Sequence, residues 1–354
     1  MASGGVSGYA ALNAKVRVMY STLFSQEKLT ELYEAADFDA LIANLRNSPY
    51  GPYLENDKDK NLTARRAAYE IRGRLTHDYH AIIQIAPKQA QMLLTQRLRY
   101  FEVDNLKAVL RGIIAKSSWE RVQFVLFPLG SETVLPAQEM LESGSMAAAI
   151  ELLRGTPYYE TLSHAMRRFS AEQNIFPLEV ALDLTYWREL WQIVNTLPGN
   201  DRVQARRLIG TLVDANNLMW AIRYRVYFHL AEEELINYTL PFGYHVRDED
   251  IRAIAAGADI AQVVRRIYPE LPDVDDMLQD PQHGLGDLEM ALSRDLLRQC
   301  RAAFVGDPFQ VGVPLAYLQL LELEIQDLTV LMEAKASGIP PQDIRPYLNI
   351  HEKA

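Results

Sequence analysis

The chain has 354 residues, of which 49% are hydrophobic and 23% charged, a composition ordinary for a globular protein of two or three domains. Its formal net charge of −10 argues against nucleic acid as a partner and against adsorption to anionic lipid. It contains no uncharged apolar run of about 20 residues, so we expect no direct insertion into a bilayer. The single cysteine, Cys300, excludes an intrachain disulfide and suits a reducing compartment.

The N-terminal part of the chain is predicted to be helical. Residues 9–21 carry apolar side chains at helical spacing, and Ser25 stands where an N-cap would begin the next helix. Asp37 is placed to cap a short helix over residues 37–47, which should end before Pro49.

This short helix occurs twice more along the chain. One copy covers residues 145–154 ahead of Pro157, and the other covers residues 259–266 ahead of Pro269. From Pro49 to Pro157 and from Pro157 to Pro269 the spacings are 108 and 112 positions. A fixed period of this size indicates that one structural unit is repeated.

A longer helical segment also occurs three times, over residues 100–116, 212–228 and 322–338. Its first two copies share an acid, an asparagine three residues later and an arginine further on, whereas the third keeps the acid but has a glutamate in place of the arginine. The acids are 112 and 110 positions apart. The motif residues are Glu102, Asn105 and Arg111 in the first copy, Asp214, Asn217 and Arg223 in the second, and Glu324, Asp327 and Glu333 in the third.

The three repeated acids fall within the apolar face of their helices. A buried carboxylate must be paired, protonated or directed into a wet cavity, because burying it bare costs several kcal/mol. Two interpretations therefore stand. In the first, the acids line a cavity that a partner occupies. In the second, which is the more frequent arrangement in helical bundles, each acid is neutralised within its own unit by an arginine from the preceding long helix. The candidate arginines are Arg97, Arg99, Arg206 and Arg207.

The fold class predicted from these patterns is all-α, since the apolar runs have helical and not alternating spacing. A proline-containing turn follows the first two repeated helices at residues 126–130 and 239–243, and only residues 338–341 resemble it after the third. We expect three similar helical units over residues 1–124, 125–236 and 237–354, the last one cut short.

No catalytic, cofactor-binding or metal-binding constellation is predicted. The chain lacks glycine-rich phosphate loops and a nucleophile elbow. His77 and His80 could share one helical face, but no third ligand stands at metal-site spacing.

Several stretches together resemble the C-type subunit of the prokaryotic V-type (A/V-type) ATPases, the counterpart of the eukaryotic d-type subunit. They are the phrase YAALNAKVRVMYSTLFS, the Ser-Pro-Tyr-Gly that ends the first short helix, the triplicated acid-bearing helix, and AYLQLLELEIQDLTVLMEAKASGIP near the end. The resemblance runs from about Tyr9 to Leu348. Glu333 departs from the repeated pattern.

The resemblance implies three similar helical domains around a pseudo-three-fold axis, forming a funnel. One end of the funnel would receive the foot of the rotating central shaft, made of D- and F-type subunits, and the other would rest on the membrane proteolipid ring. Such a subunit has no catalytic residue and no cofactor, is present once per complex, and lies peripherally on the cytoplasmic face. Two other interpretations remain: a free helical-repeat scaffold, and an all-α enzyme with a carboxylate site and a metal at His77 and His80.

Overall fold

The computed structural model describes residues 6–55 and 62–349, and every regular element in these ranges is a helix, which confirms the all-α prediction. Within the same ranges, none of the helices combines the length and apolar character needed to cross a bilayer. Six long helices carry the architecture: α5 (Ala64–Ile83), α6 (Lys88–Ile114), α11 (Phe176–Thr196), α12 (Gly199–Val226), α17 (Pro281–Ala302) and α18 (Gly312–Ala336).

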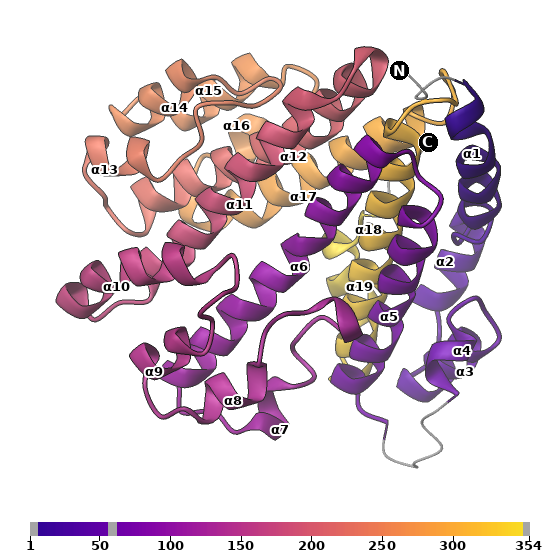
Figure 1. Ribbon diagram of the computed structural model, residues 1–354. Helices are drawn as coiled ribbons and strands as arrows, with labels where there is room; N and C mark the ends of the chain where they lie inside the picture. The colour runs from indigo at the N-terminus through magenta and orange to yellow at the C-terminus, as the bar shows by residue number, and fades with distance from the viewer. Residues whose placement is uncertain (1–5, 56–61, 350–354) are drawn as a thin grey trace.

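Shorter helices surround this framework (Figure 1). The N-terminal ones are α1 (Val6–Tyr20), α2 (Gln26–Tyr33), α3 (Phe38–Arg46) and α4 (Gly51–Leu54). The middle of the chain contributes α7 (Trp119–Val122), the 3-10 turn η1 (Gly130–Glu132), α8 (Ala137–Glu142), α9 (Met146–Glu151) and α10 (Tyr159–Glu172). The last part adds α13 (Glu232–Asn237), α14 (Asp248–Ala255), α15 (Ile260–Ile267), α16 (Val274–Met277), α19 (Pro341–Ile344) and η2 (Arg345–Tyr347).

The long helices form three hairpins that close into a cycle. Consecutive helices pair as α5 with α6, α11 with α12, and α17 with α18. Each hairpin then packs on the next: α6 on α11, α12 on α17, and α18 back on α5. The C-terminal part of the chain therefore contacts the N-terminal part directly.

The three repeated segments are the second helices of these hairpins, namely α6, α12 and α18. Their N-terminal parts come together, because Asp201 at the start of α12 accepts a hydrogen bond from the N–H of Val311, 2.8 Å away, just before α18. Arg97 in α6 pairs with Glu322 in α18 at 2.8 Å. Toward their C-terminal ends the three helices spread apart in Figure 1.

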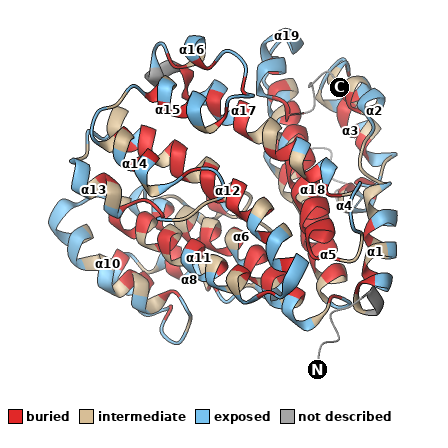
Figure 2. Cartoon of the chain, turned by 90° about the horizontal axis from the view of Figure 1, so that it is seen from above, coloured by how far each residue is buried: buried red, intermediate tan, exposed pale blue. Residues whose placement is uncertain are grey.

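Helix α18 is the centre of the core. Nineteen of its 25 residues are buried, because its sequence is largely apolar and neighbouring helices cover most of its surface. Those neighbours are α1, α3, α5, α12, α17 and α19. Figure 2 shows buried residues concentrated along α5, α12 and α18, and exposed residues on the peripheral α10 and α13.

The predicted caps of the first short helices are confirmed. The side chain of Ser25 accepts the N–H of Lys28, and that of Asp37 accepts the N–H of Ala40. Ser145 and Asp259 cap the two later copies in the same way. A side-chain oxygen at this position satisfies an amide that the helix itself leaves without a partner.

Candidate functional site

The first repeated acid, Glu102 in α6, is buried with 3% of its surface exposed. Its carboxylate accepts hydrogen bonds from the hydroxyl of Tyr158 at 2.5 Å, the hydroxyl of Thr133 at 2.9 Å and the N–H of Val134 at 2.6 Å. All three donors come from the chain that follows α6. The loop after the helix therefore folds back to satisfy the acid.

The second acid, Asp214 in α12, is fully buried. It accepts three consecutive backbone N–H groups, from Tyr244 at 2.9 Å, His245 at 2.6 Å and Val246 at 3.1 Å. The loop approaches so closely that a Cβ on Gly243 would clash with Oδ1 of Asp214. Burial raises the pKa of Asp214 to about 6, against the opposing effect of these three donors.

The third acid, Glu324 in α18, obtains its partners from the other end of the chain. It accepts the N–H of Phe24 at 2.6 Å and the hydroxyl of Tyr50 at 2.7 Å. The guanidinium of Arg74 in α5 lies 3.6 Å away. Burial raises the pKa of Glu324, although Phe24, Arg74 and Tyr50 each oppose the rise.

Each of the three acids accepts at least one backbone N–H from another segment of the chain. Glu102 and Glu324 also accept a tyrosine hydroxyl. Val134 follows Glu102 by 32 positions, and Val246 follows Asp214 by the same number. In the third unit the equivalent amide belongs to Phe24, which lies 300 positions from Glu324. The N-terminal segment therefore supplies the backbone donor of the third repeat.

The repeated amide positions hold the loops that follow the helices. The side chain of Asn105 both donates to the carbonyl of Phe127 at 2.9 Å and accepts its N–H at 2.5 Å. Asn217 makes the same pair of bonds to Leu240, each at 2.9 Å. In the third copy Asp327 accepts the N–H of Asn349 at 2.9 Å. The loop of the third repeat thus extends to position 349, beyond the residues 338–341 in which we sought it.

The arginines expected to neutralise the acids have other partners. Arg97 pairs with Glu322, Arg206 binds the side chain of Asn195, and Arg99 lies 3.5 Å from the amide oxygen of Gln96. Arg207 is likewise no partner of Asp214, whose donors in the described part of the chain are backbone amides. This expectation was wrong, because loop amides and tyrosine hydroxyls satisfy the acids instead. Within the described residues, the arginine that lies within 4 Å of a repeated acid is Arg74, beside Glu324.

The tyrosines next to Pro49, Pro157 and Pro269 each lie close to one repeated acid, and removal of the hydroxyl should not have the same effect on all three. We expect Tyr158→Phe and Tyr50→Phe each to lower the free energy of unfolding by about 1–3 kcal/mol, because a buried carboxylate loses a donor. The hydroxyl of Tyr268 is buried without a hydrogen-bond partner among the described residues, so Tyr268→Phe should be neutral or slightly stabilising. Chemical denaturation of the three variants tests the order, and an equal loss in all three would contradict it.

A hollow lies between the repeated helices. It consists of two adjoining cavities of about 530 and about 200 Å³, and both are lined by Tyr100, Glu322 and Gln326. The first cavity is bounded chiefly by α5, α6 and α18, and the second by α6, α12, α17 and α18. We call these joined cavities the hollow.

A regular stripe of each repeated helix faces the hollow, and its side chains lie three to four residues apart, as one face of a helix requires. In α6 these are Tyr100, Asp104, Ala108 and Arg111; in α12 they are Leu212, Asn216, Trp220 and Arg223; in α18 they are Glu322, Gln326 and Val330. Sequence reasoning missed most of this stripe, because helical periodicity places these residues on one face but does not show whether that face meets a cavity or bulk solvent.

Of the predicted motif residues, Arg111, Arg223 and Asn105 line the hollow. The acids Glu102 and Asp214 do not, because they point into the helix and loop contacts described above. Glu324 and Asp327 border a separate cavity of about 210 Å³ beside the end of α1. The repeated acids are therefore placed to hold the walls together.

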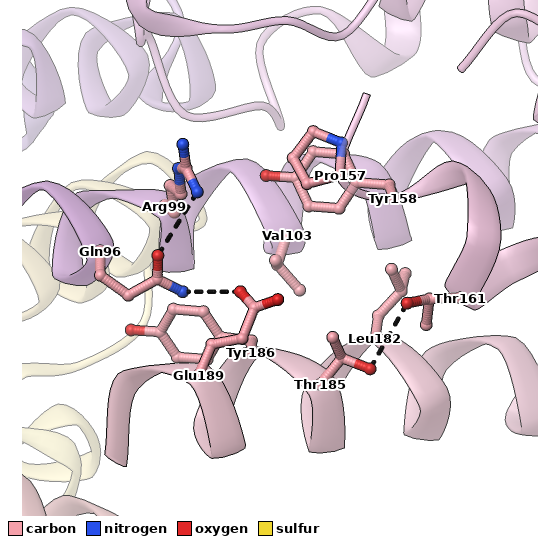
Figure 3. A pocket seen from close by; sticks show the side chains of 10 residues that line it. All are labelled: Gln96, Arg99, Val103, Pro157, Tyr158, Thr161, Leu182, Thr185, Tyr186 and Glu189. Atoms are coloured by element: carbon pink, nitrogen blue, oxygen red, sulfur yellow. Dashed lines mark hydrogen bonds between the residues drawn. The ribbon is translucent and has the colours of Figure 1, made fainter. Parts of the chain in front are cut away.

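Figure 3 shows a further cavity, between α6 and α11 beside Tyr158. Its volume of about 20 Å³ is enough for a single water molecule. The amide of Gln96 donates to Glu189 at 3.1 Å along one wall. This space is a packing gap too small for a substrate.

Groups of three or more His, Cys, Asp or Glu side chains that could hold a metal ion do not occur among the described residues. His80 lies 3.4 Å from a carboxylate oxygen of Glu132, and His77 is exposed. Cys300 is buried, and burial raises the pKa of its thiol to about 12. A thiol in that setting is a poor nucleophile.

The fold and the hollow define a class of all-α proteins in which helical hairpins close around a space that is walled by three repeated helices. The family of the ATP synthase (C/AC39) subunit matches residues 12–347, and the chain belongs to this family of V- and A-type ATPase C subunits. The resemblance stated from the sequence is thereby confirmed.

Similar proteins are found among archaea. The C subunit of the A-type ATP synthase of Methanocaldococcus jannaschii is 26% identical over 96% of this chain and 86% of its own length. The proteins of the same name from Methanothermobacter thermautotrophicus and Pyrococcus abyssi are 24% and 23% identical, over 96% and 95% of this chain and 87% and 89% of their own lengths.

Proposed function

We propose that this chain is a non-catalytic central-stalk subunit of a rotary ATPase, in which the hollow receives the foot of the rotating shaft. The observation that supports this most directly is that three copies of one helix, from distant parts of the sequence, wall a single space. A site that holds the end of a rotating shaft has to contact the inserted protein segment from several sides at once. Three related walls provide such a grip without a catalytic group.

The second part of the proposal is that the opposite end of the molecule rests on the proteolipid ring. The chain would then couple shaft and ring during ion transport, as one copy per complex, peripherally on the cytoplasmic face of the membrane. Its relatives are named as subunits of A-type ATP synthases, which supports membership in such a complex. The shaft partners would be the D- and F-type subunits.

We further propose that the repeated units surround a pseudo-three-fold axis and form a funnel. The closed cycle of three hairpins supports this arrangement. The expected units, residues 1–124, 125–236 and 237–354, exchange contacts across their limits, since Glu102 binds Tyr158 and Glu324 binds Tyr50. Such exchange would make the socket one mechanical body, as torque transmission requires.

Filling the hollow tests the proposal. Ala108→Trp places a large side chain at a half-buried position in the larger cavity, so it should abolish shaft binding while the unfolding temperature stays close to that of the wild type. The matched control, Ala171→Trp on the exposed side of α10, should bind normally. The assay is co-purification with D- and F-type shaft subunits and with proteolipid from detergent-treated membranes.

Wild-type protein that recovers neither shaft nor proteolipid would overturn the proposal and favour a free helical scaffold. Shaft binding by the Ala108→Trp variant at the wild-type level would show that the hollow is not the socket.

A further inference from the structure

We infer that the hollow has an asymmetric charged rim that orients the inserted protein segment: Arg111 and Arg223 each bind a carboxylate of that segment, and Glu333 binds a lysine or arginine of it. This inference rests on the proposed function. It adds the charge pattern of the partner and the reason why the partner would enter in one orientation.

The three rim residues occupy equivalent positions. Each stands four residues before the C-cap of its helix, and these C-caps are Ala115 in α6, Tyr227 in α12 and Ser337 in α18. All three rim side chains belong to exposed residues. They therefore mark the same level on three walls that spread apart toward this end (Figure 1).

The rim residues continue the stripe that lines the hollow. Arg111 follows Ala108 in the wall of the larger cavity, and Arg223 follows Trp220 in the wall of the smaller one. Glu333 stands three residues after Val330 and seven after Gln326, which keeps it on the hollow-facing side of α18. Two walls thus end in a cation and the third ends in an anion.

The two arginines are already engaged with the neighbouring hairpin, but weakly. Arg111 contacts Glu179 of α11 at 2.5 Å, and Arg223 contacts Glu289 of α17 at 2.7 Å. Their side chains remain 62% and 44% exposed, and ion pairs at such positions contribute only about 0–1 kcal/mol.

Each arginine uses one nitrogen in the contact that it makes within the chain, Nε in Arg111 and a terminal nitrogen in Arg223. A guanidinium has five N–H donors in a planar fork, so each arginine can bind a second carboxylate without releasing the first. The rim is therefore able to bind an acidic partner without losing its internal contacts.

The signs of the charges are reversed where α18 packs on α5. Here the repeated helix α18 carries the acid, Glu333, and the first helix of the neighbouring hairpin, α5, carries the base, Arg72. Arg72 lines the larger cavity together with Arg111, and the negative charge of Glu333 opposes the lowering of the pKa of Arg72 by burial. The departure of Glu333 from the repeat is thus matched by Arg72, and it breaks the equivalence of the three walls.

A structural role and a partner-binding role make different predictions for exchanged charges. The double variant Arg111→Glu with Glu179→Arg keeps an ion pair between the hairpins but reverses the charge on the rim. If these residues only hold the hairpins together, the double variant should regain both the stability and the shaft binding that Arg111→Glu alone has lost. If the rim binds the partner, the double variant should regain stability, but its shaft binding should remain as weak as that of Arg111→Glu.

Binding to the purified complex of D- and F-type shaft subunits should be measured at about 0.1 M salt. We expect Arg111→Glu with Arg223→Glu to weaken binding about tenfold or more, and Glu333→Arg to weaken it several-fold. The exchanged pair should remain as weak as Arg111→Glu alone. The controls Arg202→Glu and Glu160→Arg alter exposed charges away from the rim and should bind like the wild type.

Orientation is tested by crosslinking. Cysteines introduced one at a time by Ala115→Cys, Tyr227→Cys and Ser337→Cys lie at equivalent exposed C-caps, and the native Cys300 is buried. A single cysteine on the foot of the shaft should crosslink to one of the three positions. In the Glu333→Arg background it should crosslink to more than one.

The inference is overturned if the wild type binds the shaft but the rim variants bind equally well, if the exchanged pair restores binding, or if all three cysteines crosslink equally in the wild type. Failure of the wild type to bind the shaft would instead refute the proposed function on which the inference rests.

Discussion

Arg74→Met is expected to lower the free energy of unfolding by about 3–5 kcal/mol, because it leaves buried carboxylates without their cation. The guanidinium of Arg74 is 4% exposed and lies 3.6 Å from Glu324 and 3.9 Å from Asp78. It also donates to the hydroxyl of Thr22 at 2.6 Å and stacks over the ring of Tyr50. Burial alone would lower the pKa of Arg74, but Tyr50, Tyr317 and the two acids together raise it, so the arginine stays charged.

Chemical denaturation measures this effect, with Arg65→Met at the exposed start of the same helix as the control. The control should change stability by less than about 0.5 kcal/mol. Because the loss arises from an uncompensated charge, the double variant Arg74→Met with Glu324→Gln should recover part of it. A double variant that loses the full sum of the two single effects would contradict this account.

Asp214→Ala should also be strongly destabilising, by about 3–5 kcal/mol, because three backbone N–H groups lose their acceptor inside the core. The donors belong to consecutive residues, from Tyr244 to Val246, so the whole loop after α13 depends on one carboxylate. We expect increased hydrogen exchange of these three amides along with the lower stability. Unchanged protection of the amides would show that water replaces the carboxylate.

Asp214→Asn provides a matched control with a pH signature. The pKa of Asp214 is about 6 in the folded protein and about 4 when unfolded, so the folded state binds the proton more tightly. Stability of the wild type relative to the Asn variant should therefore rise by about 2–3 kcal/mol as the pH falls from 7 to 4. A difference that stays constant over this range would mean that the donors of the loop hold the pKa near its ordinary value.

The repeated acids show where sequence reasoning succeeded and where it stopped. Helical periodicity placed Glu102, Asp214 and Glu324 on buried faces, and all three are buried. The periodicity of a helix says nothing about which distant group will reach such a face. The partners proved to be loop amides and tyrosines, and the N–H of Phe24 lies 300 positions from Glu324.

Prediction of the hollow from the sequence is limited for the same reason. Its stripe has a clear period in α6 and α12, yet half-polar stripes are equally typical of helix surfaces that face bulk solvent. Only the closure of α18 on α5 turned these stripes inward. Glu333 departs from the repeated pattern, and α5, the helix on which α18 closes, carries a base, Arg72, whose pKa the charge of Glu333 raises.

The sequence by itself therefore determined the all-α class, the helix caps and the burial of the repeated acids, because each of these depends on residues within a few turns of one another. It also showed the triplicated helix, because the same local pattern can be compared directly between its copies. Tertiary structure decided which groups satisfy the acids, how the N-terminal segment completes the third repeat, and which side chains face the hollow. These features depend on contacts across tens to hundreds of positions, which no local pattern encodes.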